Sequence, residues 1–234
     1  MTDRAGSGVD DDHGWTERLA WAYDLIAPAP AERAAALARL DTARSEVDAA
    51  VLRIHQSWHP RPWFRRKARD RSAAQRAYDQ AASRSLPQAL WTRPSEDFST
   101  WPGLPYALLF LEWEARYPQE WTQHAKAWGT KQSLIRDVAG ADHDHQVRAK
   151  LVDLVDLVVQ RPHRCKDREY VRVARAVDGD ELRGRLHRSL DTDNSWTQLH
   201  ASYVLWLLDH PEVPNTRHVW RTWLGRDGRT SQSP

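Results

Sequence analysis

The chain has 234 residues, of which 41% are hydrophobic and 28% charged, and its formal net charge is +2. This composition excludes an intrinsically disordered protein and fits one helical domain of ordinary size, or one domain with an appended hairpin. A single cysteine, Cys165, excludes an internal disulfide. Together with the lack of an apolar signal core at the N-terminus, it predicts a cytoplasmic protein. Apolar runs such as ALLFLEW are too short to cross a bilayer, so we expect no membrane partner.

The N-terminal residues 1–14, MTDRAGSGVDDDHG, are polar and acidic, which predicts a disordered tail. Residues 15–90 are expected to form the N-terminal helices. The first of these spans 15–26, because its apolar residues fall on one helical face, and Pro28 ends it. That face comprises Trp15, Leu19, Ala22, Tyr23 and Ile26.

A long antiparallel helical hairpin is predicted next. From Pro30 to Trp58 there is no glycine or further proline, and apolar residues recur in alternating steps of three and four, a coiled-coil seam. Arg44 occupies one slot of this seam, and the other slots hold Leu37, Leu40, Val47, Val51, Ile54 and Trp58. A second helix is predicted from Pro62 to about Leu90. The short break between the two helices favours an antiparallel pair.

The Pro-rich and Gly-containing stretch 91–105 predicts a linker between two domains. Residues 106–225 then carry a succession of apolar helical patterns, separated by glycines, prolines and capping residues such as Asp144 and either Asn194 or Asp193. They begin with YALLFLEWEARY, which predicts a central buried helix. Residues 226–234 are expected to be a disordered tail. Most of the 13 tryptophans occupy positions where a helix would bury them.

Residues 181–208 consist of a leucine-spaced helix, the acidic turn DTDN and a longer second helix, and 142–159 look like the turn and second helix of another such unit. This pattern resembles HEAT-like repeats. It departs from that family because the second helix carries bulky Tyr203 and Trp206 and no fixed period links the two units. The resemblance implies a scaffold that binds other macromolecules along one face. With no strand signal, we expect an all-α fold: a long hairpin followed by a compact helical bundle or a short HEAT-like α-solenoid.

Two histidine-containing clusters, HDH at 143–145 and HRC at 163–165, offer zinc-type ligands. The residues between them are predicted to form one helix, whose ends would lie about 22 Å apart at about 1.5 Å per residue. The two clusters therefore cannot share a metal, and we expect neither a metal nor a cofactor. His143 and Asp144 also resemble the motif of the histidine–aspartate phosphohydrolases, for which His124 and Asp209 could be nominated as further ligands. However, Asp144 is placed at a helix start rather than within a helix.

The strongest local charge lies in residues 53–76, which carry eight basic and one acidic side chain, a local charge of +7. Arginine suits phosphate oxygens, and an indole can stack on a base. An acidic protein surface would be served equally well, and a solvated helix face is a third interpretation. The candidate binding residues are Arg61, Trp63, Arg65, Arg66, Lys67, Arg69, Arg71 and Arg76.

No Gly-rich phosphate loop, nucleophile elbow or HExxH motif is present, and no carboxylate pair has a spacing that singles it out for acid–base work. The sequence therefore favours a non-enzymatic, cytoplasmic protein-interaction or scaffold module, with no small-molecule ligand inferred. One alternative is a nucleic-acid-associated accessory protein that uses the basic segment. Another is an enzyme whose site the sequence does not reveal.

Overall fold

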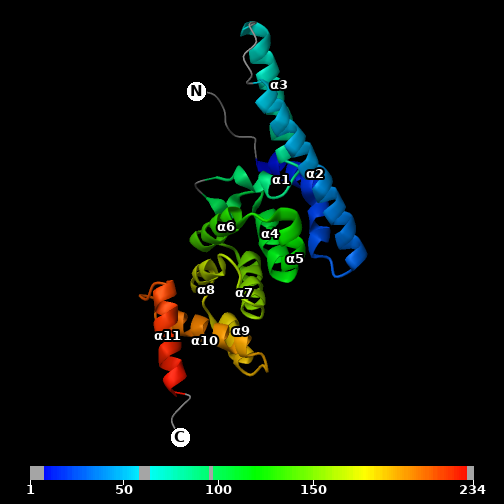
Figure 1. Cartoon of the computed structure of the whole chain (residues 1–234). Coiled ribbons are helices and arrows are strands. Elements are labelled where there is room, and N and C mark those ends of the chain that lie inside the picture. Colours follow the sequence, from blue (N-terminus) through cyan, green and yellow to red (C-terminus); the bar gives the residue numbers. More distant parts are fainter. Residues whose placement is uncertain (1–7, 58–63, 95–96, 231–234) are drawn as a thin grey trace. The chain divides into compact units, whose positions relative to one another are not determined.

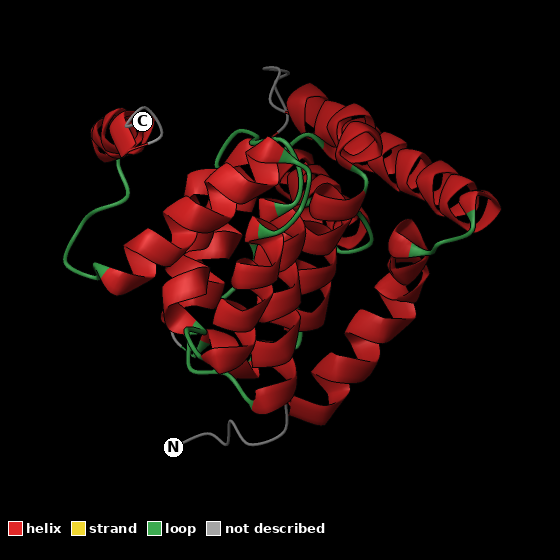
Figure 2. Cartoon of the chain, turned by 90° about the horizontal axis from the view of Figure 1, so that it is seen from below, coloured by secondary structure: helices red, strands yellow, loops and turns green. Residues whose placement is uncertain are grey.

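The computed structural model describes residues 8–57, 64–94 and 97–230. Figures 1 and 2 show helices and loops in this part of the chain and no strand, so the predicted all-α class is confirmed. The chain divides into two compact units, an N-terminal unit up to Thr130 and a C-terminal unit from Lys131. Within the described ranges, every helix is too short or too polar to span a bilayer.

The elements of the N-terminal unit begin where the sequence supplies helix-starting residues, as at Pro30 and Pro118, since proline fits the first position of a helix. In chain order these elements are α1 (Gly8–Leu19), the 3₁₀ helix η1 (Ala20–Ile26), α2 (Pro30–Ser57), α3 (Phe64–Ala82), the 3₁₀ helices η2 (Gln88–Trp91) and η3 (Phe98–Thr100), α4 (Leu104–Arg116) and α5 (Pro118–Ala125).

Helices α2 and α3 lie side by side (Figure 1) and bury a small apolar cluster between them. The buried members are Val47, Ala50 and Ala81, and the half-buried Val51 and Tyr78 pack against them. Helix α3 ends at Ala82, not near Leu90 as predicted. Residues 83–87 form turns instead, and Pro87, which cannot donate an amide hydrogen bond, precedes η2.

Arg44 does not serve as a seam residue, contrary to our expectation. Its guanidinium donates a hydrogen bond to the main-chain carbonyl of His124 at the end of α5. The same face of α2 carries Asp41, whose carboxylate lies 3.0 Å from His124 Nδ1, and Arg33, which pairs with Glu120 at 3.3 Å. This face of α2 is therefore linked to α5 through polar contacts.

Helix α4 is a buried helix, as predicted, but it belongs to the N-terminal unit and not to the predicted C-terminal domain 106–225. Near its start, Tyr106 stacks on Trp15 with ring centroids 5.7 Å apart, and Trp101 meets Trp15 edge-on at 5.4 Å. Gly103 sits against these rings so closely that an added Cβ would lie 2.3 Å from Trp101 and 2.7 Å from Trp15. Glycine is thus required where the chain enters α4.

The two compact units do not meet at the predicted linker 91–105. Phe98 and Trp101 are buried, and α4 packs against both η1 and η3, so this stretch belongs to the core of the N-terminal unit. The division falls instead in the first turn of α6, between Thr130 and Lys131. Proline and glycine here mark tight turns between packed aromatic residues, which composition alone cannot distinguish from a linker.

Both predicted disordered tails are also partly helical. Helix α1 begins at Gly8, so residues 8–14 are helical, whereas 1–7 lie outside the described residues. Helix α11 runs to Thr230 through Gly225, at which we expected it to end; 231–234 are not described. A glycine inside a helix costs only about 1 kcal/mol, and an added Cβ at Gly225 would meet nothing within 4 Å.

The C-terminal unit is a set of short helices, and two of them, α7 and α10, are capped by the predicted side chains. Asp144 accepts a hydrogen bond from the amide of Val147 at 2.8 Å, and Asn194 accepts one from the amide of Trp196 at 3.0 Å. The elements are α6 (Trp128–Gly140), α7 (His145–Val159), the 3₁₀ helix η4 (Asp167–Glu169), α8 (Tyr170–Ala176), α9 (Asp180–Leu190), α10 (Ser195–Asp209) and α11 (Arg217–Thr230). Helix α9 packs against α10, and α7 packs against α8 and α9.

The packing of α2 on α3 predicts that Val47→Asp destabilises the protein. Val47 is only 4% exposed, so the variant buries an unpaired carboxylate, which should lower the free energy of unfolding by roughly 2 to 5 kcal/mol. Leu52→Asp on the same helix is the matched control, because Leu52 is 59% exposed and should tolerate the charge. Urea unfolding followed by circular dichroism measures both variants. Equal effects would show that residues 47–81 are not packed as described.

Candidate ligand cavity of the C-terminal unit

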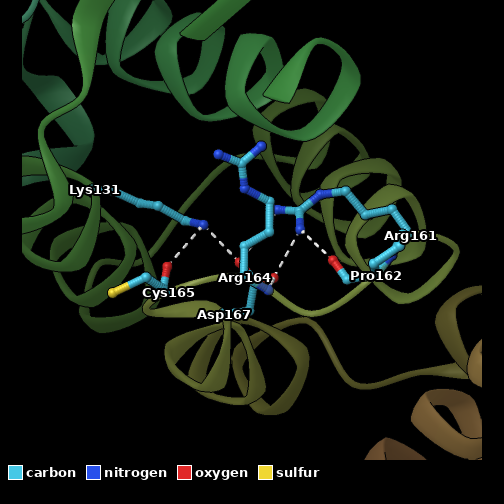
Figure 3. A network of polar contacts seen from close by, with 6 residues as sticks. All are labelled: Lys131, Arg161, Pro162, Arg164, Cys165 and Asp167. Carbon is cyan, nitrogen blue, oxygen red and sulfur yellow. Dashed lines mark hydrogen bonds and ion pairs between the residues drawn. The ribbon is translucent and has the colours of Figure 1, made fainter. Parts of the chain in front are cut away.

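A buried carboxylate, that of Asp167, joins three segments of the C-terminal unit (Figure 3). Asp167 Oδ1 accepts a hydrogen bond from Lys131 Nζ of α6 at 2.5 Å. Its Oδ2 accepts from Arg161, just beyond α7, at 2.8 Å, and from the Arg164 amide at 2.6 Å. Lys131 also donates to the Cys165 carbonyl at 3.2 Å. Lys131 is 0% and Asp167 5% exposed, so both charges are removed from water.

The network keeps Asp167 ionised. Burial by itself would raise the pKa of this carboxyl, but the nearby charges and hydrogen bonds of Lys131 and Arg161 outweigh burial, and the pKa is lowered. One carboxylate faces two cations, so the cluster carries an excess positive charge. A carboxylate with a lowered pKa and occupied oxygens is a poor general base. The role of Asp167 is structural, because its hydrogen bonds and ion pairs hold the neighbouring chain segments in place.

The chain between α7 and η4 takes an unusual path at this point. Lys166 adopts a left-handed backbone conformation, with φ of 72°. A residue with a side chain pays about 1 to 2 kcal/mol for this conformation. The flanking carbonyl of Cys165 and carboxylate of Asp167 are both held by Lys131. The ion pairs therefore hold a strained turn in place directly before η4.

Next to this turn lies a cavity of about 370 Å³. One wall is formed by valines of α7, α8 and α10, and another by aromatic residues of α10 and α11. Its polar groups come mainly from the chain around η4 and from the start of α11. The lining residues are Val155, Val158, Val159, His163, Asp167, Arg168, Tyr170, Val171, Trp196, His200, Tyr203, Val204, Asn215, Arg217 and Trp220.

Two histidines, His163 and His200, face each other in this lining with ring centroids 5.9 Å apart. The His200 ring also lies 6.1 Å from Trp196 and 6.3 Å from Trp220. Partial desolvation in the cavity lining lowers the pKa of His163, and the positive charges of Arg161, Lys131 and Arg168 add to this against the opposing effect of Asp167. Burial, aided by His163, also lowers the pKa of His200. Both imidazoles are therefore neutral at neutral pH and can donate or accept a hydrogen bond.

Asn215 links several segments of the cavity lining. Its side-chain oxygen accepts a hydrogen bond from the Tyr203 hydroxyl at 3.0 Å, and its amide donates to the carbonyl of Arg168 at 2.8 Å. Trp220 packs edge-on against Tyr203 with centroids 4.6 Å apart. These contacts bring the start of α11 to η4 and α10, although the three segments are distant in sequence.

A second ion cluster surrounds Glu169, the last residue of η4. Arg136 of α6 pairs with it at 2.7 Å, Arg172 of α8 at 3.0 Å, and Gln132 donates a hydrogen bond at 2.8 Å. The hydrogen bonds from Arg136, Gln132 and Arg172 outweigh burial and lower the pKa of Glu169 to about 2. This cluster lies outside the cavity lining and holds η4 against α6 a second time.

The candidate binding residues singled out in the sequence all belong to the N-terminal unit. Arg61 and Trp63 lie outside the described residues. Helix α3 begins at Phe64, so it contains the remaining members. Arg71 and Arg76 are exposed, while for Arg65, Arg66, Lys67 and Arg69 only the helical backbone is described.

The other histidine-based candidates are not brought together as sites. Asp144 caps α7, His124 lies against Asp41, and Asp209 pairs with Arg183 at 2.7 Å. Among the residues that the structure describes, no group of three or more histidine, cysteine, aspartate or glutamate side chains gathers as metal ligands would.

The sequence analysis considered His163 as a zinc-type ligand but identified neither His200 nor the cavity. A signal was present: Trp196, His200 and Tyr203 recur at i, i+4 and i+7 on one face of α10. This spacing is the same for a core stripe and for a cavity wall, so it could not decide between them. Comparison of the chain with protein-family models, with curated proteins and with solved structures finds no match.

Proposed function

We propose that the chain is a binding protein whose C-terminal unit holds an apolar, aromatic-sized ligand in the cavity beside η4. The observation that carries this proposal is the cavity itself. Its volume of about 370 Å³ falls within the range of about 300 to 1,000 Å³ typical of ligand pockets. Apolar walls with a few convergent polar groups are the usual composition of such sites.

Binding is favoured over catalysis by the state of the nearby acids. Asp167 and Glu169 both have lowered pKa values and accept hydrogen bonds from cationic partners. General acid–base catalysis needs a group whose pKa lies near the working pH. The neutral imidazoles of His163 and His200 suit the orientation of a bound ligand through hydrogen bonds.

The interaction module expected from the sequence stays a proposal. The packing of α9 against α10 across a short acidic turn supports the HEAT-like interpretation of these two helices. A cytoplasmic setting is likewise proposed, on the single exposed thiol of Cys165. No particular protein partner follows from either of them.

Filling the cavity tests the proposed function. Val158 lines it from α7, so Val158→Phe should lower the affinity for the neutral probe 2-(2-naphthyl)ethanol by roughly tenfold or more. Val147→Phe on the same helix is the matched control, because Val147 is not part of the lining. Isothermal titration calorimetry on the full chain gives the affinities. Equal binding by Val158→Phe, or failure of the parent to bind both this alcohol and its carboxylate analogue 2-naphthylacetate, would refute the proposal.

A second candidate function, nucleic-acid binding, is favoured by the exposure of Arg71 and Arg76 on α3 within a segment of local charge +7. Phosphate contacts release counterions, so affinity should fall steeply with salt. Five engaged phosphates would give a log–log slope of about −4.5 on duplex DNA.

Replacing Arg65, Arg66, Arg69 and Arg71 by glutamine should flatten that slope by roughly 3 units in a fluorescence-anisotropy titration. The control replaces four exposed arginines elsewhere, namely Arg39, Arg84, Arg188 and Arg221. Identical slopes for the two quadruple variants, or no binding by the parent at low salt, would exclude a nucleic-acid arm on α3.

A further inference from the structure

We propose that the ligand of this cavity is a small aromatic carboxylate, with its ring among the valines and aromatic side chains and its carboxylate held by Arg168 and Arg217 at the rim. This inference rests on the proposed function and adds the charge and polarity of the ligand. Three observations support this inference. They are the charge distribution around the cavity, the contrast between its apolar interior and its charged edge, and an exposed tryptophan in its lining.

The charge around the cavity is predominantly positive. Three charged side chains line it: Arg168, Arg217 and Asp167. Asp167 faces Lys131 and Arg161 behind the wall, and its two oxygens are occupied by them and by a backbone amide. In the part of the chain that the structure describes, neither lining arginine forms an ion pair. A ligand anion would therefore meet two available guanidinium groups and no available carboxylate.

The lining has an apolar interior and a charged edge. Val155, Val159 and Val171 are buried, whereas Arg168 and Arg217 are exposed to solvent. A polar ligand group placed among these valines would lack a hydrogen-bond partner, at a cost of about 1 to 3 kcal/mol. A fully apolar ligand would leave the arginines unused. An apolar ligand body with a single terminal anion matches both the apolar interior and the charged edge of the cavity.

An aromatic body is favoured by the rings in the wall. Trp196, His200, Tyr203 and Trp220 approach one another edge-on or at a tilt, and a further ring in the cavity can pack against them in an offset or edge-to-face contact. Trp196 is 59% exposed although it lines the cavity. A bound ring would cover this apolar surface, which is otherwise in contact with water.

Three compounds that share one aromatic body separate the charge preference from simple apolar binding. They are 2-naphthylacetate, 2-(2-naphthyl)ethanol and 2-(2-naphthyl)ethylammonium, titrated into the full chain by calorimetry at neutral pH and low salt. We expect the anion to bind roughly tenfold more tightly than the alcohol, and the cation more weakly than the alcohol. Added salt should weaken only the anion.

The arginines are tested by Arg168→Gln and Arg217→Gln, each of which should lower the affinity for 2-naphthylacetate by roughly three- to tenfold and leave the alcohol unchanged. Arg188→Gln, an exposed arginine outside the lining, is the control. If anion and alcohol bind equally well, or if both weaken equally in the arginine variants, the carboxylate proposal is overturned and the apolar site stands. If none of the three compounds binds, the proposed function falls with it.

Discussion

The C-terminal unit depends on one ionised carboxylate that has been taken out of water. Asp167 is stabilised there only because Lys131 and Arg161 supply opposite charge and the Arg164 amide completes its hydrogen bonds. An unpaired buried charge would cost several kcal/mol, so the three segments that carry these groups must stay together. That requirement fixes the left-handed turn at Lys166 and hence the start of η4, which forms part of the cavity.

The same interaction links structure to the proposed binding. By neutralising Asp167 with two cations, the protein places a carboxylate next to an apolar cavity without making the cavity repel anions. Arg168 follows Asp167 directly in η4, so the fixed position of η4 also brings this cationic side chain to the rim. The fold of the C-terminal unit thus supplies apolar walls from helix faces and a positive edge from one short 3₁₀ segment.

Features that depend on local residue spacing could be predicted from the sequence. Contacts between residues far apart in the chain could not. Helix starts at Pro30 and at the caps Asp144 and Asn194 were predictable, because a proline or a capping side chain acts within one turn. Lys131 and Asp167 are 36 residues apart, and nothing in one sequence couples them. The sequence placed Arg44 in the predicted seam of α2, but residue spacing alone does not tell which neighbouring helix that face of α2 contacts.

Native-state hydrogen exchange across η4 and α8 tests most directly whether the Asp167 ion pairs hold this wall of the cavity. Asp167→Asn should lower the opening free energy of these segments by about 3 kcal/mol, which speeds amide exchange roughly a hundredfold. Asp153→Asn removes a carboxylate from an exposed ion pair with Arg185 and should leave η4 and α8 near the parent rate. If α8 exchanges at the parent rate in both variants, the Asp167 network does not organise the C-terminal unit.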